Sequence, residues 1–174
     1  AIGIISSIMG VFFVRVGKKG SLTGALNKGV FASTVLMAIL TFIVIVRQGF
    51  DVSIFYAVVT GLLAGIMIGL ATEYYTSSDK SPAKSIAAAA QTGAGTNIIQ
   101  GIAVGMRSTM LPVIFISLAV ILSYKFGGLY GVALSAVGML STLGITMAID
   151  TYGPVADNSA GIAEMAKMGP KIYL

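Results

Sequence analysis

The sequence predicts an all-α, polytopic bundle of transmembrane helices, because the chain is strongly apolar, carries few charges and contains several long uncharged segments. Its mean hydropathy is +0.96, and 56% of its 174 residues are hydrophobic. Charged residues make up 10% of the chain, against about 25% in an ordinary soluble domain. Long apolar segments in lipid must be helical, because their backbone polar groups have no water to bond.

The residue types that are missing exclude several kinds of chemistry. The chain has no cysteine and no histidine, so it has no disulfides, no thiol nucleophile and no imidazole base or metal ligand. What remains is chemistry with carboxylates, hard cations, lysine and arginine. The net charge of +5 does not indicate nucleic-acid binding, because the placement of charges in a membrane protein matters more than their sum.

Five membrane crossings are expected, and the apolar segments that predict them are 1–14, 29–46, 52–72, 108–124 and 126–149. A helical span needs about 20 residues, so the first, shorter segment is interpreted as the second half of a transmembrane helix. The chain begins without methionine and ends in "KMGPKIYL" with nothing to close the last helix. We therefore expect a fragment of a larger, multi-pass cell-membrane protein.

The distribution of lysine and arginine predicts the orientation of these spans. All but two of the 11 basic residues lie in three segments, 15–28, 73–107 and 150–174. The exceptions are Arg47 and Lys125. Because cytoplasmic loops carry an excess of positive charge, the three segments are expected to be cytoplasmic.

The segment 73–107 is predicted to contain a short cytoplasmic helix. Ser81 followed by Pro82 is typical of an N-cap and the first helical position, and "AKSIAAAAQ" favours a helix as far as Thr92. Gly93 is a natural stop. Thr96 or Asn97 is expected to cap the next helix.

Glycines at helical spacing are expected to let helices approach closely in lipid. In the segment 52–72 these are Gly61, Gly65 and Gly69, and in the segment 126–149 they are Gly127, Gly128, Gly131 and Gly138.

Three acids follow the last apolar segment at intervals of seven residues: Asp150, Asp157 and Glu164. On a helix they would share one face, drifting by about 20° per heptad and separated by about 10 Å along the axis. Pro154 would free the carbonyl of Asp150, which suggests a place for a cation. The alternative is that the acids, Glu164 above all, form the solvated end of a span.

A second polar stretch, "TEYYTSSDKSP", follows the segment 52–72. Glu73, with partners such as Lys80, could hold the cytoplasmic helix ends in register. The alternative is an interfacial belt of aromatic residues. The nearby "TGAGTN" lacks the spacing of a phosphate-binding loop.

Two long motifs, "TEYYTSSDKSPAKSIAAAAQTGAGTNIIQGIAVGM" (72–106) and "GMLSTLGITMAIDTYGPVADNSAGIAEMAKM" (138–168), resemble the membrane-integral inorganic pyrophosphatases. The resemblance implies a homodimer whose subunits have about sixteen helices, with the remainder of the pump polypeptide lying outside this segment. It further implies hydrolysis of magnesium pyrophosphate in a cytoplasmic funnel, coupled to pumping of H⁺, Na⁺ or both.

The resemblance also implies roles for individual residues. Asp157 matches an aspartate of the Mg²⁺–pyrophosphate site, with Asn158 beside it and Asp150 one heptad deeper. Glu73 matches a glutamate with a structural or supporting role, and Lys80 is expected to be a supporting residue near it. The chain has "SAGIAEM" where the family has A-G-G-I-A-E-M, a small-for-small change. The catalytic base and the ion-gate residues are expected outside this chain, so the segment alone is expected to be inactive. A K⁺ requirement depends on a position after its C-terminus.

Two other interpretations stay open. A secondary transporter or channel domain without hydrolytic activity is suggested by Pro154 beside an acid, because transporter sites often use broken helices. A structural membrane subunit is the third. Further D-x-x-x-D motifs in the flanking sequence would favour the pump, and inverted hydropathy repeats would favour the transporter.

Overall fold

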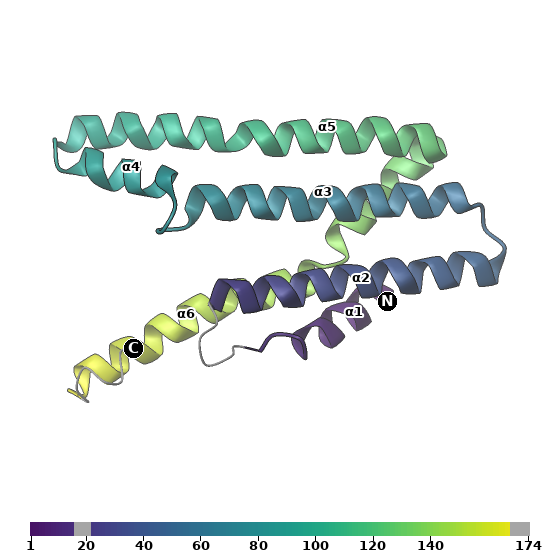
Figure 1. Cartoon of the computed structure of the whole chain (residues 1–174), viewed down its shortest axis with the longest axis horizontal. Helices are drawn as coiled ribbons and strands as arrows, with labels where there is room; N and C mark the ends of the chain where they lie inside the picture. Colours follow the sequence, from purple (N-terminus) through teal and green to yellow (C-terminus); the bar gives the residue numbers. More distant parts are fainter. Residues whose placement is uncertain (16–21, 168–174) are drawn as a thin grey trace. The chain divides into compact units, whose positions relative to one another are not determined.

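The computed structural model describes residues 1–15 and 22–167, and these form helices joined by short connections, with no strand among them (Figure 1). The predicted all-α class is therefore confirmed. The helices are α1 (Ile2–Val11), α2 (Leu22–Gln48), α3 (Val52–Thr76), α4 (Ser81–Ala90), α5 (Ala94–Leu140) and α6 (Leu143–Met165). Three of the basic residues used to predict orientation, Lys18, Lys19 and Lys171, lie outside the described residues.

The chain divides into two compact units, which are described separately. The terminal unit comprises Ala1–Leu40 and Ser141–Leu174, and the central unit comprises Thr41–Leu140. Helix α1, the first part of α2 and α6 belong to the terminal unit. Helices α3, α4 and α5 belong to the central unit together with the end of α2.

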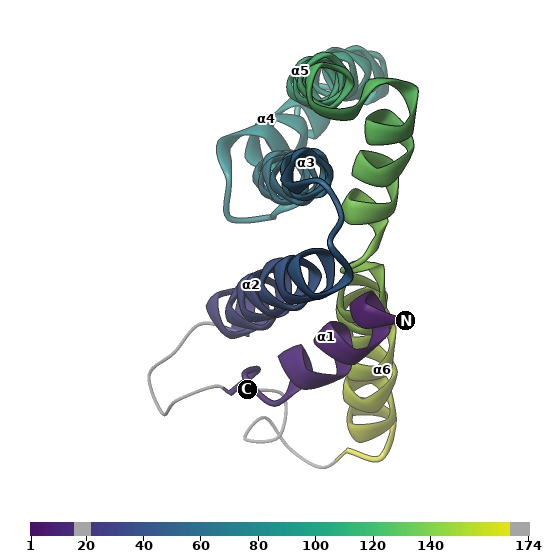
Figure 2. The same cartoon turned by 90° about the vertical axis from the view of Figure 1, so that its right-hand side faces the viewer.

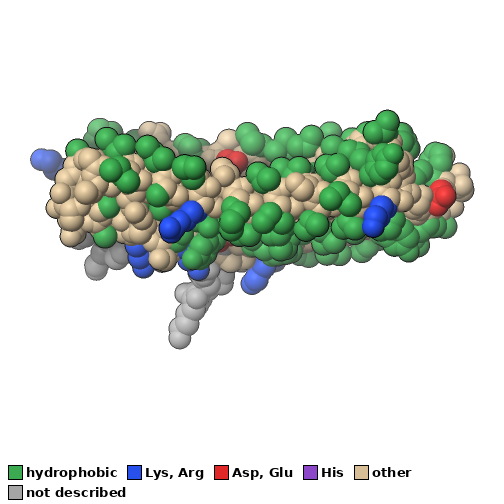
Figure 3. All heavy atoms as spheres, turned by 90° about the horizontal axis from the view of Figure 1, so that it is seen from above, with side chains coloured by type: hydrophobic (Ala, Val, Ile, Leu, Met, Phe, Trp, Pro, Cys, Tyr) green, Lys and Arg blue, Asp and Glu red, His purple; other side chains and the backbone are tan. Residues whose placement is uncertain are grey.

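Three helical runs are long and apolar enough to cross a membrane: Gly24–Gln48, Val52–Ala90 and Ala94–Met165, and the shorter α1 is also apolar. Hydrophobic side chains cover much of the face shown in Figure 3. Large side chains such as Leu129, 81% exposed, and Met106, 72% exposed, have little cover within the described part of the chain. Such a surface suits a membrane protein, because soluble monomers rarely expose large apolar patches. The five individual crossings stay a prediction.

The helix bounds differ from the predicted spans in the second half of the chain. Helix α5 begins at Ala94 and passes through the whole predicted span 108–124. The predicted span 126–149 is interrupted twice, first at Gly127–Gly128 and again between α5 and α6. Gly128 has φ +57° and ψ −147°, a backbone conformation that is essentially restricted to glycine. A Cβ at either glycine would meet no atom within 4 Å, so the prediction that they pack closely is wrong: they form a turn.

Helix α3 packs against α5, including the part of α5 that follows this turn, and the two lie side by side in both views (Figures 1 and 2). A Cβ at Gly61 would collide with the carbonyl oxygen of Ser135, and one at Gly138 would lie 2.5 Å from the carbonyl oxygen of Val58. Gly65 makes an ordinary contact at 3.4 Å, and Gly69 has nothing within 4 Å. The predicted glycine face of α3 is therefore confirmed at Gly61 and Gly65 and wrong at Gly69.

The short helix in the polar segment exists, but its ends differ slightly from the prediction. Helix α4 has Lys80 at its N-cap with no side-chain cap, so Ser81 is helical instead of capping. Gly93 has φ +132° and separates α4 from α5, as predicted. Because α5 already begins at Ala94, Thr96 lies in its first turn, where its hydroxyl donates to the Gly93 carbonyl at 2.9 Å. The prediction that Thr96 or Asn97 caps this helix is therefore wrong.

Small residues also make the core of the terminal unit. Ile145 of α6 is 1% exposed, and its Cδ1 would lie 3.0 Å from a Cβ placed at Gly10 of α1 or at Gly29 of α2. Ser33 of α2 is fully buried beside Gly10. The three helices can meet here because two of the contacting positions have no side chain.

The glycine contact of α3 generates a prediction. Gly61→Ala should lower the free energy of unfolding in detergent by about 1–3 kcal/mol, because overpacking forces backbone to move. Gly69→Ala on the same helix is the matched control, and should be neutral or slightly stabilising because alanine favours helix more than glycine does. Equal effects of the two substitutions would contradict the packing described.

The N-terminus of α3 has a side-chain cap that generates a pH prediction. Asp51 Oδ1 accepts a hydrogen bond from the backbone N–H of Ser53 at 2.8 Å, and this bond lowers the pKa of the exposed Asp51 carboxyl below 3.8. A lowered pKa means that the cap stabilises the helix above pH 3.8 and that this contribution is lost as the pH falls through the folded-state value.

Hydrogen exchange at the Ser53 amide, relative to an uncapped amide, should therefore accelerate when the pH is lowered through the folded-state pKa of Asp51. Asp51→Ala should show the faster exchange already at neutral pH, whereas Asp51→Asn should keep the cap at both pH values, because asparagine caps as well as aspartate. A pH response that survives in Asp51→Asn would rule out this carboxylate as its source.

Candidate acidic site on helix α6

Helix α6 carries four of the residues that the sequence singles out: Asp150, Asp157, Asn158 and Glu164. The helix is continuous from Leu143 to Met165, and Pro154 lies inside it. Proline has no N–H to donate to the carbonyl of residue i−4, which here is Asp150. The helix nevertheless continues through Pro154 to Met165. The heptad acids therefore sit on a single helical segment.

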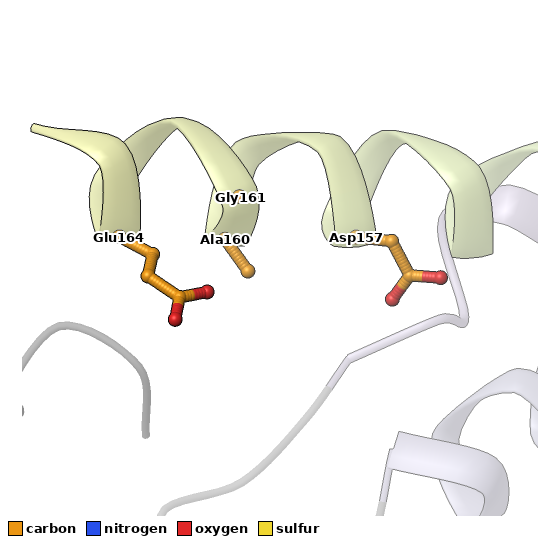
Figure 4. A pocket seen from close by; sticks show the side chains of 4 residues that line it. All are labelled: Asp157, Ala160, Gly161 and Glu164. Carbon is orange, nitrogen blue, oxygen red and sulfur yellow. The ribbon is translucent and has the colours of Figure 1, made fainter.

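Asp157 and Glu164 line one shallow, open depression together with Ala160 and Gly161. Figure 4 shows both carboxylates on the same side of α6, with the small residues between them. Both acids are exposed. Ala160 and Gly161 leave room between the carboxylates because neither has a side chain larger than a methyl group.

Asp150 and Asn158 do not line this depression. Asp150 is exposed one heptad before Asp157. Asn158 is also exposed, and it is turned by about 100° from Asp157, because an α-helix has 3.6 residues per turn.

Glu73 and Lys80 belong to the central unit and are described with it. Glu73 is half-buried near the end of α3, where its backbone carbonyl accepts from Ser77 N–H at 2.9 Å. Lys80 is exposed at the N-cap of α4. Tyr74 and Tyr75, which follow Glu73, contact each other edge-on with ring centroids 5.3 Å apart. Glu73 therefore ends a membrane-length helix beside two aromatic rings.

The acids of α6 can supply one ligand to a hard cation but not a complete site. Asp157 and Glu164 are about 10 Å apart along the helix by its rise per residue, whereas Mg²⁺ holds oxygen ligands at 2.0–2.1 Å, so the two do not share an ion. Within the described residues, no cluster of three acidic, histidine or cysteine side chains could hold a metal. An exposed carboxylate fits Mg²⁺ well, because Mg²⁺ usually takes one or two protein carboxylates and keeps several waters.

A polar contact that the sequence did not indicate joins α4 to α5. Gln100 Nε2 donates to Ser85 Oγ at 3.0 Å, and Ser85 in turn donates to the Pro82 carbonyl at 2.7 Å. None of the residues of α4 is buried, so this bond is among the few specific contacts that hold the short helix. The two residues are 15 positions apart, and no pattern in a single sequence pairs side chains at that distance across a turn.

The chain is similar to one protein family and to several longer relatives. A family model described as "Inorganic H+ pyrophosphatase" matches residues 1–173. A putative K(+)-stimulated pyrophosphate-energized sodium pump of Bacteroides thetaiotaomicron is 44% identical over 187 residues, which covers 99% of this chain and 26% of the relative. A K(+)-insensitive pyrophosphate-energized proton pump of Methanosarcina mazei is 41% identical over 177 residues, covering 97% and 26%.

A third relative is much closer to this chain in length. Pyrophosphate-energized proton pump 2 of Rhizobium leguminosarum bv. trifolii is 40% identical over 182 residues, which covers 97% of this chain and 85% of the relative. The chain thus spans about a quarter of the length of the first two relatives and most of the length of the third.

The contact between α4 and α5 generates a prediction. Ser85→Ala and Gln100→Ala should each speed hydrogen exchange across α4, because each removes one partner of a bond worth about 1 kcal/mol. The double variant should be no faster than the faster single variant, since both changes remove the same interaction. Thr109→Ala, which removes a hydroxyl bonded within its own helix, is the control. Additive effects of Ser85 and Gln100 would mean that the two side chains do not act through one bond.

Proposed function

Because the chain belongs to the inorganic H⁺ pyrophosphatase family, we propose that it forms part of an ion-translocating membrane pyrophosphatase. The proposed pump hydrolyses magnesium pyrophosphate to two phosphates and moves H⁺, Na⁺ or both across the membrane. Family membership over residues 1–173 supports this proposal, as do the membrane-length apolar helices. A secondary transporter, channel domain or structural subunit is not favoured, because the matched relatives are named as pyrophosphate-energized pumps.

Asp157 is proposed to be the residue of this chain that binds the Mg²⁺ accompanying pyrophosphate. Three observations support that role: its carboxylate is exposed, it lines an open depression, and small residues leave space beside it. When bound, Mg²⁺ neutralises phosphate charge and orients an attacking water. Asp157 contributes one oxygen ligand, and the remaining ligands and the catalytic base come from the rest of the pump polypeptide. Asp150 and Asn158 are weaker candidates for contact with the same substrate.

Glu73 and Lys80 are proposed to support the cytoplasmic ends of the helices. The segments 15–28, 73–107 and 150–174 are proposed to be cytoplasmic, which their excess of positive charge supports. Residues 16–21 and 168–174 lie outside the described part of the chain. The protein would reside in the cell membrane as a multi-pass homodimer.

The choice of pumped ion and the response to K⁺ are not decided by similarity. The relatives include a K⁺-stimulated sodium pump at 44% identity and a K⁺-insensitive proton pump at 41% identity. The two names differ in both properties, while the identities differ little. Mg²⁺ is the proposed cofactor because an exposed carboxylate suits it, and K⁺ is a proposed activator because one relative is named as K⁺-stimulated.

The decisive experiment is the substitution Asp157→Asn in the complete pump polypeptide, which removes the charge and keeps the size of the side chain. Magnesium-dependent hydrolysis of pyrophosphate should fall by about 100-fold or more, equivalent to about 2.7 kcal/mol of barrier, while the protein still inserts. The measurement is phosphate release from membrane vesicles at saturating pyrophosphate and varied Mg²⁺.

The matched control is Asp79→Asn, the same chemical change at an exposed acid between α3 and α4, and it should stay within about twofold of the unsubstituted pump. Turnover by Asp157→Asn at the unsubstituted rate would contradict the proposed role of Asp157. Absence of pyrophosphate hydrolysis in the unsubstituted pump would contradict the proposed function itself.

A further inference from the structure

The start of α6 is held by a contact that depends on two glycines from other helices. Ile145, 1% exposed, is the only large apolar side chain of α6 that is buried within the described residues. Its Cδ1 fits where side chains at Gly10 and Gly29 would otherwise lie, 3.0 Å from a Cβ at either position. We call Gly10 and Gly29 the glycine notch. A methyl group added at either glycine would lie closer to Ile145 Cδ1 than most side-chain contacts allow, so the isoleucine would have to shift.

Further contacts hold the same end of α6 against α1, and Figure 2 shows α1 beside the start of α6. A Cβ at Gly3 would lie 2.6 Å from the Ser141 carbonyl oxygen, and one at Gly144 would lie 3.1 Å from Ser7 Cβ. The Ser7 hydroxyl donates to the Ser141 carbonyl at 3.5 Å. The first turn of α6 and the residues before it are therefore packed at backbone distance.

Most of α6 beyond this first turn has little cover within the described chain. Apart from Ile145, Ala163 is the one buried residue of the helix. Asp150, Asp157 and Glu164 are all exposed. Among the described residues, the contact of Ile145 with the glycine notch is therefore the main apolar contact that fixes the direction of α6, beside the backbone contacts at its first turn.

We propose that Ile145, seated in the glycine notch, is a positioning residue for Asp157. This inference depends on the proposed function, because it assigns Ile145 a role in the placement of the proposed Mg²⁺ ligand. The twelve residues from Ile145 to Asp157 span about 18 Å of continuous helix, so a tilt of about 5° at the notch would move Asp157 by about 1.5 Å. Displacements of about 1 Å in a catalytic site can reduce rates by about 100-fold.

Two roles of Ile145 can be told apart by experiment: filling the core only, or positioning α6 as well. Loss of packing alone lowers the stability and the amount of folded pump, and leaves the Mg²⁺ concentration that gives half-maximal hydrolysis unchanged. Displacement of Asp157 raises that Mg²⁺ concentration in the folded pump. The experiment must therefore measure Mg²⁺ dependence and thermal stability in the same variants.

The first variant, in the complete pump polypeptide, is Gly29→Ala, which places a methyl group against Ile145 Cδ1. It should raise the half-maximal Mg²⁺ concentration by about threefold to tenfold, since the added group displaces the isoleucine. The new methyl group would meet Val14 Cγ2 more closely than it meets Ile145 Cδ1, so this variant and the double variant below also carry Val14→Ala, and Val14→Ala alone is measured beside them. Gly69→Ala, with nothing within 4 Å, is the control and should leave the value unchanged.

The second variant combines Gly29→Ala with Ile145→Val, which deletes the Cδ1 atom that the new methyl group meets. The double variant should return to within about twofold of the unsubstituted pump, because one methyl group replaces another in the notch. If Gly29→Ala does not insert, Ile145→Ala empties the notch instead, and it should also raise the half-maximal Mg²⁺ concentration.

The results separate this inference from the proposed function. Variants of the notch that change thermal stability but leave the Mg²⁺ dependence unchanged would overturn the positioning role, as would a double variant that is no better than Gly29→Ala. Either result leaves the proposed function standing if Asp157→Asn is inactive. An active Asp157→Asn pump would overturn the role of Asp157 whatever the notch variants do.

Discussion

The structure depends on the close approach of helices whose surroundings are as apolar as their own side chains. In lipid, helices gain no hydrophobic energy by associating, so van der Waals contact between small residues becomes the main source of specificity. In the central unit this contact lies where Gly61 meets the Ser135 carbonyl. In the terminal unit it lies where Ile145 meets Gly10 and Gly29. A methyl group added at any of these glycines would force the contacting atoms to move.

Buried hydroxyls follow the same constraint, because serine and threonine are small enough for helices to approach and polar enough to need a partner. Ser123 satisfies its hydroxyl within its own helix by donating to the Ala119 carbonyl at 2.6 Å, and Thr34 does the same with the Val30 carbonyl at 2.9 Å. Ser6 and Ser33 are fully buried with no hydrogen-bond partner among the described residues. An unpaired buried hydroxyl lowers the free energy of unfolding by about 1–3 kcal/mol. Close packing of the helices in the terminal unit therefore comes with a loss of stability at these serines.

The candidate site has the form expected of a protein whose substrate is surrounded by several helices. One helix presents Asp157 with space around it, and no metal cluster is completed within the described residues. The proposed substrate, magnesium pyrophosphate, would need several carboxylates or waters on the metal and lysines on the phosphate oxygens, and a single helix cannot bring several carboxylates within 2.1 Å of one ion. The position of Asp157 is therefore as important as its presence, and that position is set about 18 Å away where α6 begins.

The sequence by itself determined the membrane class, the helical content and the acidic residues of α6, because these follow from composition and from helical periodicity, which act over short distances. Gly93 as the stop of α4 was predictable for the same reason, since a positive φ is a local property. Only the tertiary structure decided that Gly61 makes a close contact while Gly69 makes none, because both glycines lie on one face of the same helix and only the neighbouring helix distinguishes them. The tertiary structure also decided the hydrogen bond of Gln100 with Ser85 and the contact of Ile145 with Gly10 and Gly29. Both contacts depend on which helices touch. That is determined by the packing of whole helices and not by any one segment.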